Sequence, residues 1–543
     1  QFRLKQMDDM FMLGDTMGEY IPKSCSNCRK CTTCTYAGKA ISQKERIELE
    51  YIERGITHDK EKKQFEIQYP FLEDPRDALT DNRRQAIAYA TSLEKKLDKH
   101  KLTEKFDEEF EKFLKTKSLR KIQDEELKSW DGPVHYVPLQ LVVNEGSQST
   151  PFRIVTNTSC KDPKTGKSLN DILAKGPNLL SDSYQILLRF RNRKYAISTD
   201  VTKAYHGLRT GSAEMHLRRV VYRKSKDKEW ETYGFLCVSF GDVCAQCILE
   251  CCLKQIGEAY KHWDMVAATM ILLDRFVDDQ PSGSDSKKII DRLRGNIMED
   301  WQTTGTLAAM YAMGGFVLKV VACSGDKDGP MVQKLGGAIL GIKWCTETDK
   351  FSIPLTVNIS YRRKGSPTGP DLTEADIEVL EQAVLTRRIC LSVTMSLYDP
   401  LGFIVPLTIR LKWLLQELAK ASTPGDWDEP LSAAQKVPWK EILNLMIEQK
   451  DIILDRSCKP EDVNLLEEVI LITFMDGSNA AKAFVAYMRY MLLCGEAHVS
   501  LLAAKAKLNS AGGQSTPRSE MDGHTLGARG VKNITTALKE VTP

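Results

Sequence analysis

An apolar run that ends in two adjacent aspartates constrains this 543-residue chain most strongly. The run begins at Ile271, reaches Asp278 and Asp279, and is followed by turn-forming residues at 281–283. This order predicts a strand, a tight turn that carries the two acids, and a second strand. Neighbouring carboxylates repel each other unless a cation lies between them, so the pair suggests a site for a hard divalent metal.

A lone aspartate pair at a turn is more often a solvated loop, so a third acid is needed to support a metal site. The segment 194–200 reads as another strand that ends in an acid, Asp200. If Asp200 meets Asp278 and Asp279 in space, the three carboxylates can hold two magnesium ions. Two such ions, roughly 3.5–4 Å apart, suit in-line displacement at phosphorus.

Two short motifs resemble those of reverse transcriptases. Residues 276–279 match the aromatic-X-Asp-Asp box, and residues 198–206 resemble the first carboxylate motif. Tyr205 falls five positions after Asp200, where those enzymes carry an aromatic residue. The resemblance implies that this ring excludes a 2′-hydroxyl and so selects deoxynucleotides. The alternative is a tyrosine that only packs in the core.

Composition sets wider limits. The length predicts several domains, and 42% hydrophobic residues with a mean hydropathy of −0.33 suit globular domains with real cores. No run of 18 uncharged apolar residues occurs, so we expect no membrane span. A net charge of +3 neither demands nor excludes nucleic acid. The chain starts without methionine or a signal pattern, and we expect a piece of a longer polypeptide.

Two basic clusters are close in sequence to Asp200. A charged solvent face is the usual interpretation of such clusters, and contact with a phosphate backbone is the alternative. Their members are Arg189, Arg191, Arg193 and Lys194 in the first and Arg218, Arg219, Arg223, Lys224 and Lys226 in the second.

Fifteen cysteines without a secretory signal indicate a reducing compartment and free thiols. Most lie in apolar contexts and read as small core residues. The exception is a group spaced three residues apart, for which zinc is our first expectation, an iron–sulfur cluster is chemically possible, and unliganded thiols remain open. Its members are Cys25, Cys28, Cys31 and Cys34.

Periodicity predicts how the chain is organised. Residues 42–118 read as amphipathic helices, and 134–344 as alternating strands and helices. Segments 137–143 and 152–156 predict an antiparallel pair, and 243–260 a long helix. Near the end, 469–478 reads as a strand that ends in Asp476, with an antiparallel neighbour at 483–489 and a helix that opens at Pro517.

Taken together, these motifs resemble the polymerase polyprotein of BEL/Pao long-terminal-repeat retrotransposons over almost the whole chain. The polymerase boxes alone indicate only a reverse transcriptase, whereas the blocks 399–403 and 517–520 point to this subgroup. Further segments that carry the resemblance are the cysteine group, Tyr69-Pro70-Phe71, Ser168-Leu169-Asn170-Asp171, Gly176-Pro177, Gly314-Gly315-Phe316 and Leu340-Gly341.

The resemblance implies an α+β right-hand polymerase with palm, fingers and thumb, preceded by a helical region and followed by an incomplete ribonuclease-H-like α/β domain. The implied domains are a Cys-rich segment at 1–40, a helical linker at 41–130, fingers and palm at 131–345, a thumb and connection at 346–460, and the ribonuclease-H-like part at 461–543.

The implied activity is DNA synthesis on an RNA or DNA template from a DNA primer and deoxynucleoside triphosphates. Asp200, Asp278 and Asp279 would hold two magnesium ions, and Arg153 would neutralise phosphate charge. The family further implies a linked protease and integrase, no membrane, and a cytoplasmic location, with virus-like particles as the alternative setting.

Other residues take roles by the same resemblance. Phe240 and Gly241 would pack beside the nascent base pair, and Gly341 with Trp344 would lie near the primer strand. Asp476 and Glu520 resemble the first two ribonuclease H carboxylates. Because such a site needs further acids and the chain stops at Pro543, we expect no ribonuclease H activity.

The chain departs from the family pattern at several positions, which raises a second hypothesis: a catalytically inactive relic that still binds nucleic acid. A third hypothesis is a zinc-dependent interaction module formed by the N-terminal cysteines. The departures are Leu139, Gln140, Asn144, Asn157, Ala245 and Gln246.

Overall fold

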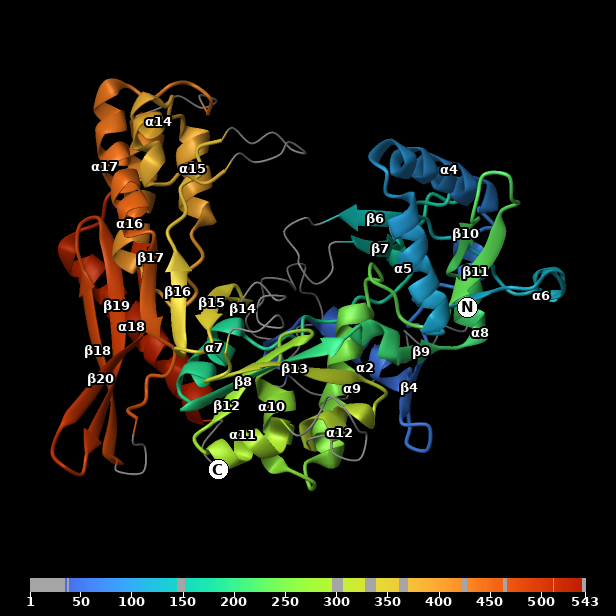
Figure 1. Ribbon diagram of the computed structural model, residues 1–543, viewed down its shortest axis with the longest axis horizontal. Helices are drawn as coiled ribbons and strands as arrows, with labels where there is room; N and C mark the ends of the chain where they lie inside the picture. The colour runs from blue at the N-terminus through green and yellow to red at the C-terminus, as the bar shows by residue number, and fades with distance from the viewer. Residues whose placement is uncertain are drawn as a thin grey trace. The chain divides into compact units, whose positions relative to one another are not determined.

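A computed structural model describes residues 35–36, 39–143, 152–294, 306–327, 338–360, 370–421, 427–461, 466–510 and 512–539 (Figure 1). Contacts divide the chain into two compact units. Unit 1 comprises Gln1–Leu180, Asp200–Gln280 and Leu293–Lys319, and unit 2 comprises Ser181–Thr199, Pro281–Arg292 and Val320–Pro543. Within the described ranges no helix is both long and apolar enough to cross a membrane.

The helices of unit 1 begin at side chains that cap them. Ser42 and Glu45 form a capping box at the start of α2, and the Asp264 carboxylate accepts the first backbone N–H groups of α10. Helix α5 presents three buried phenylalanines on one face. The helices are α2 (Gln43–Arg54), α3 (Pro75–Ala78), α4 (Arg83–His100), α5 (Thr103–Lys115), α6 (Asp124–Ser129), α8 (Ser212–His216), α9 (Ala245–Tyr260), α10 (Met265–Leu273) and α12 (Thr306–Ala312), with short 3₁₀ turns η1 (Leu169–Asp171) and η2 (Ala204–Gly207).

The described part of unit 1 also contains several small sheets. Their orders are β3-β4-β9, β10-β11-β5, β6-β7 and β1-β2. The predicted antiparallel pair is confirmed, because Leu139 of β6 lies opposite Thr156 of β7. The strands are β1 (Thr35–Tyr36), β2 (Lys39–Ala40), β3 (Ile56–Asp59), β4 (Gln64–Ile67), β5 (Leu119–Lys121), β6 (Leu139–Val143), β7 (Phe152–Thr156), β9 (Leu208–Thr210), β10 (Arg219–Tyr222) and β11 (Glu231–Phe235).

Two predictions of secondary structure in unit 1 were wrong. The region 42–118 is not helical throughout, because β3 and β4 form an antiparallel hairpin inside it. The apolar run before the aspartate pair is helix α10, not a strand, and residues 281–283 lie within β12 instead of a turn. An uninterrupted apolar run of this length carries no periodicity that separates a helix from a strand, and the Asp264 cap decides for the helix.

Strands β8 (Tyr195–Thr202), β12 (Asp279–Ser284) and β13 (Val317–Cys323) and helix α11 (Lys287–Arg294) run through the points where the chain passes from one unit to the other. Strand β8 is the middle strand of the order β12-β8-β13. The predicted strand that leads to Asp200 is thereby confirmed, although it continues two residues beyond the acid.

Unit 2 contains two antiparallel sheets and the helices that pack on them. The first sheet has the order β14-β15-β16-β17, and the second has the order β18-β19-β20. Its strands are β14 (Ala338–Ile339), β15 (Ile342–Cys345), β16 (Lys350–Pro354), β17 (Asp451–Asp455), β18 (Leu466–Gly477), β19 (Ala481–Leu492) and β20 (Ala497–Leu508). Its helices are α7 (Ser183–Arg191), α14 (Ile377–Gln382), α15 (Arg387–Ser396), α16 (Val405–Ala421), α17 (Ala433–Gln449) and α18 (Thr516–Lys539), with η3 (Glu374–Asp376).

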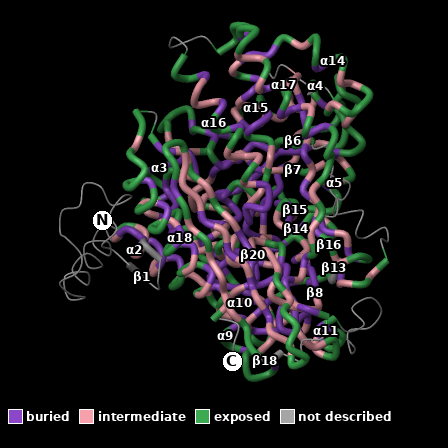
Figure 2. Tube along the Cα trace, turned by 90° about the vertical axis from the view of Figure 1, so that its left-hand side faces the viewer, coloured by how far each residue is buried: buried purple, intermediate pink, exposed green. Residues whose placement is uncertain are grey.

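One apolar core joins the two sheets and helices of unit 2. Phe190, Trp344, Phe351 and Trp439 are buried in it, and the Phe190 and Trp344 rings meet edge to face with centroids 5.3 Å apart. Figure 2 colours the trace of the chain by this burial. The predicted strand, antiparallel neighbour and helix near the end are confirmed as β18, β19 and α18.

Four arginines of the basic clusters are buried, so their side chains are not on a solvent face. Arg191 donates to the backbone carbonyls of Leu501 and Leu502, and Arg218 donates to the carbonyls of Cys237 and Phe235. Arg189 and Arg219 are also less than 5% exposed. The expectation that these four side chains contact solvent or phosphate was wrong. Arg191 and Arg218 are held mainly by backbone carbonyls, which a charge pattern does not show.

Candidate functional site

The strand β8 brings Asp200 to the edge of unit 1 where the aspartate pair lies. Residues 196–199 are buried and hold the strand in the fold, whereas the Asp200 side chain is half-buried. The backbone N–H of Val201 donates to the carbonyl oxygen of Asp278 at 3.0 Å. This hydrogen bond joins the two acidic segments directly, as the sequence predicted.

A two-residue turn, Val277–Asp278, leads into Asp279. Phe276 N–H donates to the Asp279 carbonyl at 2.8 Å, and Asp279 N–H donates back to Phe276 at 3.1 Å. Between them Val277 has φ +59°, a conformation that a β-branched residue adopts only with strain, of order 1–3 kcal/mol. The strained turn projects Asp278 and begins β12 at Asp279. Such strain persists only where the surrounding structure enforces it.

A buried ion pair supports the base of this turn. Both guanidinium NH groups of Arg275 donate to the Glu250 carboxylate of α9 at 2.7 Å, and both side chains are 4% exposed. On the other side, Tyr311 of α12 donates to Gln280 at 3.0 Å. The sequence analysis missed these positioning residues. The only available signal was a pair of opposite charges in two apolar segments.

Burial and neighbouring charges raise the pKa of two of the three carboxylates, Asp278 and Asp279. The pKa of Asp279 is raised to about 6, first by desolvation and then by the negative charges of Asp278 and Asp200. Burial also raises the pKa of Asp278, with the Asp200 charge adding to the rise, while its own backbone N–H and the Arg153 guanidinium lower it. By accessible surface both residues are exposed. One region of unit 1 therefore contains the interacting charges of Asp200, Asp278, Asp279 and Arg153.

A lysine that sequence analysis did not single out completes this group. Lys319 of β13 places its Nζ 3.3 Å from Oδ2 of Asp200. Among the described residues, no three His, Cys, Asp or Glu side chains converge closely enough to hold a metal ion. The donor set still has the right chemistry, because hard divalent cations prefer carboxylate oxygens. A cation that uses Asp200 must compete with Lys319.

Tyr205 and Phe240 lie beside the carboxylates. Burial raises the pKa of Tyr205 to about 12, with further contributions from the charges of Asp278 and Glu250. The rings of Tyr205 and Phe240 meet edge to face with centroids 5.0 Å apart. Phe240 is 39% exposed, which is high for a large apolar side chain, so the pair presents an aromatic surface to solvent.

The turn that carries Phe240 requires a glycine at the next position. Gly241 has φ +112°, and a Cβ there would lie 2.5 Å from the carbonyl oxygen of Thr156. The Thr156 hydroxyl donates to the Phe240 carbonyl at 2.8 Å, and the Thr158 hydroxyl donates to the Gly241 carbonyl at 2.5 Å. These bonds fix the turn to the end of β7, the strand on which Arg153 is exposed.

Two of the residues that depart from the family pattern form hydrogen bonds within the fold. Gln246 at the start of α9 donates to Asn178 at 3.0 Å, and the Asn157 N–H donates to the Pro138 carbonyl at 2.8 Å. Leu139 and Gln140 lie in β6, and Ala245 is the first residue of α9. Asn144 lies outside the described residues, as do Cys25, Cys28, Cys31 and Cys34.

The remaining predicted site residues belong to unit 2. Trp344 is 3% exposed, and its indole N–H donates to Asp349 at 2.9 Å, so its ring is used inside the core. Gly341, with φ +88°, faces the Tyr398 ring. Asp476 is the penultimate residue of β18, and its neighbour Gly477 packs against the backbone of α18 at Ser519 and Glu520. Both carboxylates, Asp476 and Glu520, are exposed there.

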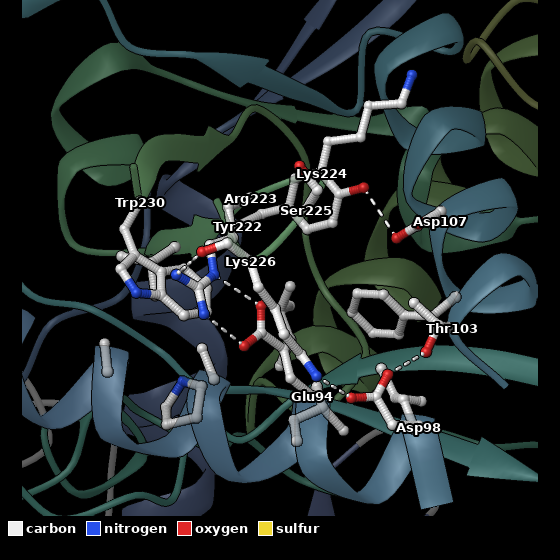
Figure 3. A pocket seen from close by; sticks show the side chains of 18 of the residues that line it. Glu94, Asp98, Thr103, Asp107, Tyr222, Arg223, Lys224, Ser225, Lys226 and Trp230 are labelled. Carbon is white, nitrogen blue, oxygen red and sulfur yellow. Dashed lines mark hydrogen bonds and ion pairs between the residues drawn. The ribbon is translucent and has the colours of Figure 1, made fainter. Parts of the chain in front are cut away.

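A separate cavity of about 80 Å³ in unit 1 has an apolar floor and a charged rim (Figure 3). Most of its charges are already paired: Arg223 donates twice to Glu94 at 2.9 Å, Lys226 contacts Asp98 at 2.5 Å, and the Tyr222 hydroxyl donates to Asp107 at 2.9 Å. One arginine and one lysine of the second basic cluster, Arg223 and Lys226, are thus neutralised locally. This cavity offers little free charge to a phosphate.

Comparisons with known proteins point to the retroelement family. Residues 386–542 match the family model described as the Pao retrotransposon-like RNaseH-like domain. The blocks at 399–403 and 517–520, on which the resemblance to this subgroup was based, both fall inside the match. The resemblance is confirmed there, and the C-terminal part of unit 2 carries the ribonuclease-H-like domain. No curated protein matches the chain.

Two solved structures are similar to this chain at low identity. One is the foamy viral protease-reverse transcriptase in complex with RNA/DNA hybrid, with 10% identity and a TM-score of 0.43, covering 80% of this chain and 47% of that one. The other is the same enzyme's dRH form in complex with double-stranded DNA, with 11% identity and a TM-score of 0.43, covering 78% and 59%. This chain therefore spans only about half the length of these proteins.

Proposed function

We propose that this Pao-type chain is the reverse transcriptase region of a retrotransposon Pol polyprotein, with palm, fingers and thumb around the acidic site. The proposed reaction is RNA-directed DNA synthesis by two-metal nucleotidyl transfer. One observation carries the proposal: the Val201–Asp278 hydrogen bond joins Asp200 to the aspartate pair, where burial together with the Asp200 charge raises the pKa of Asp278 and of Asp279. Closely spaced carboxylates at a strained turn favour a divalent cation.

Asp200, Asp278 and Asp279 would hold two magnesium ions. When bound, the ions supply charge neutralisation and lower the pKa of a primer 3′-hydroxyl. Arg153, exposed on β7 and close enough to lower the pKa of Asp278, would neutralise part of a triphosphate. Lys319 would release Asp200 when the site is filled, because both cations compete for the same oxygen.

Tyr205, Phe240 and Gly241 would shape the nucleotide position. The edge-to-face contact between the two rings holds Tyr205 rigidly, so its ring can exclude a 2′-hydroxyl. The exposed face of Phe240 can pack against a base. Gly241 lacks a side chain, which lets the turn lie directly against Thr156 and leaves room in front of it.

The second candidate is a relic that binds nucleic acid without turnover. Two observations favour it: Lys319 already neutralises Asp200, and no three-ligand cluster is assembled within the described ranges. The template, primer, deoxynucleotides, cytoplasmic setting and linkage to protease and integrase are part of the first proposal.

We also propose that Asp476 and Glu520 do not cleave RNA, since no third acid joins them among the described residues. Magnesium-dependent cutting of an RNA–DNA hybrid would contradict this.

Primer extension separates the two candidates. The chain is incubated with an RNA template, a DNA primer, deoxynucleotides and magnesium, and compared with Asp278→Asn. The matched control is Asp227→Asn, an exposed aspartate of the same unit. The polymerase proposal expects synthesis by the wild type and the control and none by Asp278→Asn. No synthesis by a wild type that binds primer–template would favour the relic.

A further inference from the structure

One cleft of unit 2 lies mainly within the ribonuclease-H-like part and has no role in the proposed active site. It has a volume of about 560 Å³ and lies between β20, α16, α18 and the start of α7. That volume falls within the range of about 300–1,000 Å³ typical of ligand sites. It is too large for a single ion and suits an extended ligand.

The block 399–403, which the proposed function leaves unexplained, builds one wall. The Asp399 carboxylate accepts N–H bonds from Gly402, Phe403 and Ile404 at 2.8–2.9 Å and so starts α16. The loop also docks on β20, because the Ala504 N–H donates to the Leu401 carbonyl at 2.8 Å. Gly402 has φ +82°, and a Cβ there would overlap the Ala504 carbonyl.

Helix α18 and the edge strand β20 build the opposite wall. A Cβ at Gly530 would lie 2.3 Å from the Phe484 ring, so the glycine lets α18 approach the sheet closely. Lys505 pairs with Phe484 in the strand register, which puts its side chain on the same face of the sheet as α18. Lys507, two residues further, shares that face.

The charges of this cleft do not cancel. Its lining includes four cations, Lys412, Lys505, Lys507 and Arg529, and two carboxylates. Among the described residues none of the four makes an ion pair within 4.0 Å. Both carboxylates already accept backbone N–H bonds: Asp399 at α16, and Asp182 from Tyr184 at 2.9 Å. The cleft therefore carries an excess of unpaired positive charge.

We propose that this cleft binds the phosphodiester backbone of a nucleic-acid strand. Four cations that line one cleft can neutralise several phosphates of a backbone, and such contacts need no particular base. This proposal rests on the proposed function in one respect. The proposed function is the reason for choosing a nucleic acid as the ligand instead of another polyanion. The cleft is distinct from the Asp476–Glu520 pair. Arg529 follows Glu520 by nine positions, about two and a half turns, so the two side chains leave α18 on opposite sides.

Equilibrium binding of a labelled RNA–DNA hybrid to the full chain, without magnesium, tests the proposal. Lys505→Gln with Lys507→Gln removes two charges from the cleft. Lys436→Gln with Lys532→Gln removes two charges from the same unit outside the cleft. We expect the cleft variant to bind at least about tenfold more weakly at about 0.1 M salt, with a salt slope shallower by about 2. The control variant should bind within about twofold of the wild type.

Two results would overturn the proposal: equal affinity and slope of the cleft and control variants, or no binding of the hybrid by the wild type. Inorganic tripolyphosphate, supplied at an equal concentration of phosphate groups, distinguishes a strand from a free polyphosphate. If it reduces wild-type binding to the level of the cleft variant, the cleft takes free polyphosphate instead. Failure of the polymerase proposal is visible separately, as binding without magnesium-dependent primer extension.

Discussion

Lys319 and Asp200 form an ion pair at the candidate site, with Nζ 3.3 Å from Oδ2. Lysine is a monovalent, tethered cation, and it occupies an oxygen that a divalent ion would use. The Lys319 side chain is 49% exposed, so the pair is screened and weak enough to exchange. The pair thus neutralises Asp200 in the metal-free protein without closing the site.

Removal of this internal competitor should strengthen magnesium binding. Exposed ion pairs contribute about 0.2–1 kcal/mol, so Lys319→Gln should lower the magnesium concentration for half-maximal primer extension by about 1.5- to 5-fold. Lys287→Gln, a change of another exposed lysine, serves as the control. A higher magnesium requirement for Lys319→Gln than for the control would show that the lysine assists the site instead.

The magnesium requirement should also depend on pH. Burial and the charges of Asp278 and Asp200 raise the pKa of Asp279 to about 6, so below that pH the carboxyl is mostly protonated. Because a proton and a metal ion compete for the same oxygens, half-saturation by magnesium should rise up to about tenfold per unit as pH falls below about 6. Extension assays at several pH values and magnesium concentrations measure this. A requirement that stays constant between pH 7 and pH 5 would contradict the raised pKa.

Tyr205 should control the choice of sugar. Tyr205→Ala removes the ring that Phe240 holds in place, so incorporation of ribonucleotides relative to deoxynucleotides should rise by about tenfold or more. Tyr205→Phe keeps the ring and should retain the wild-type preference. The ratio of kcat/KM values for deoxynucleotides and ribonucleotides measures this preference. Equal preference in all three proteins would assign Tyr205 a packing role only.

Gly241 should be intolerant of any side chain. Gly241→Ala places a Cβ 2.5 Å from the Thr156 carbonyl at φ +112°, and should cost about 1–3 kcal/mol of unfolding free energy. Gly166→Ala is the matched control, because Gly166 also has positive φ, +70°, but no atom lies within 4 Å of its Cβ position. The control should cost about 1 kcal/mol or less. Urea unfolding of both variants separates steric overlap from backbone strain, and equal costs would remove the steric argument.

The sequence predicted the acidic site better than the elements that carry it. Asp200 and the aspartate pair are joined as expected, because strand ends with acids can be recognised locally. Helix α10 was mistaken for a strand, since a short apolar run fits both. Lys319 was missed because its partner lies 119 positions earlier in the chain, as their numbers show.

The basic clusters show the other limit of sequence analysis. Arg191 and Arg218 look like surface charge in the sequence, yet both donate to backbone carbonyls in the interior. Such acceptors are present at every residue, so no pattern of side chains reveals them. By contrast, the cations of the cleft in unit 2 are spread over three elements. No local cluster marks them before the fold brings them together.

A count of bound divalent ions tests the central claim most directly, namely that Asp200, Asp278 and Asp279 form one metal site. Manganese serves as the probe, by electron paramagnetic resonance, in a complex of the chain with a terminated primer, an RNA template and the matching deoxynucleotide. The account predicts about two ions per chain, lost in the Asp278→Asn, Asp279→Asn variant. Equal ion binding by the wild type and that variant would contradict it.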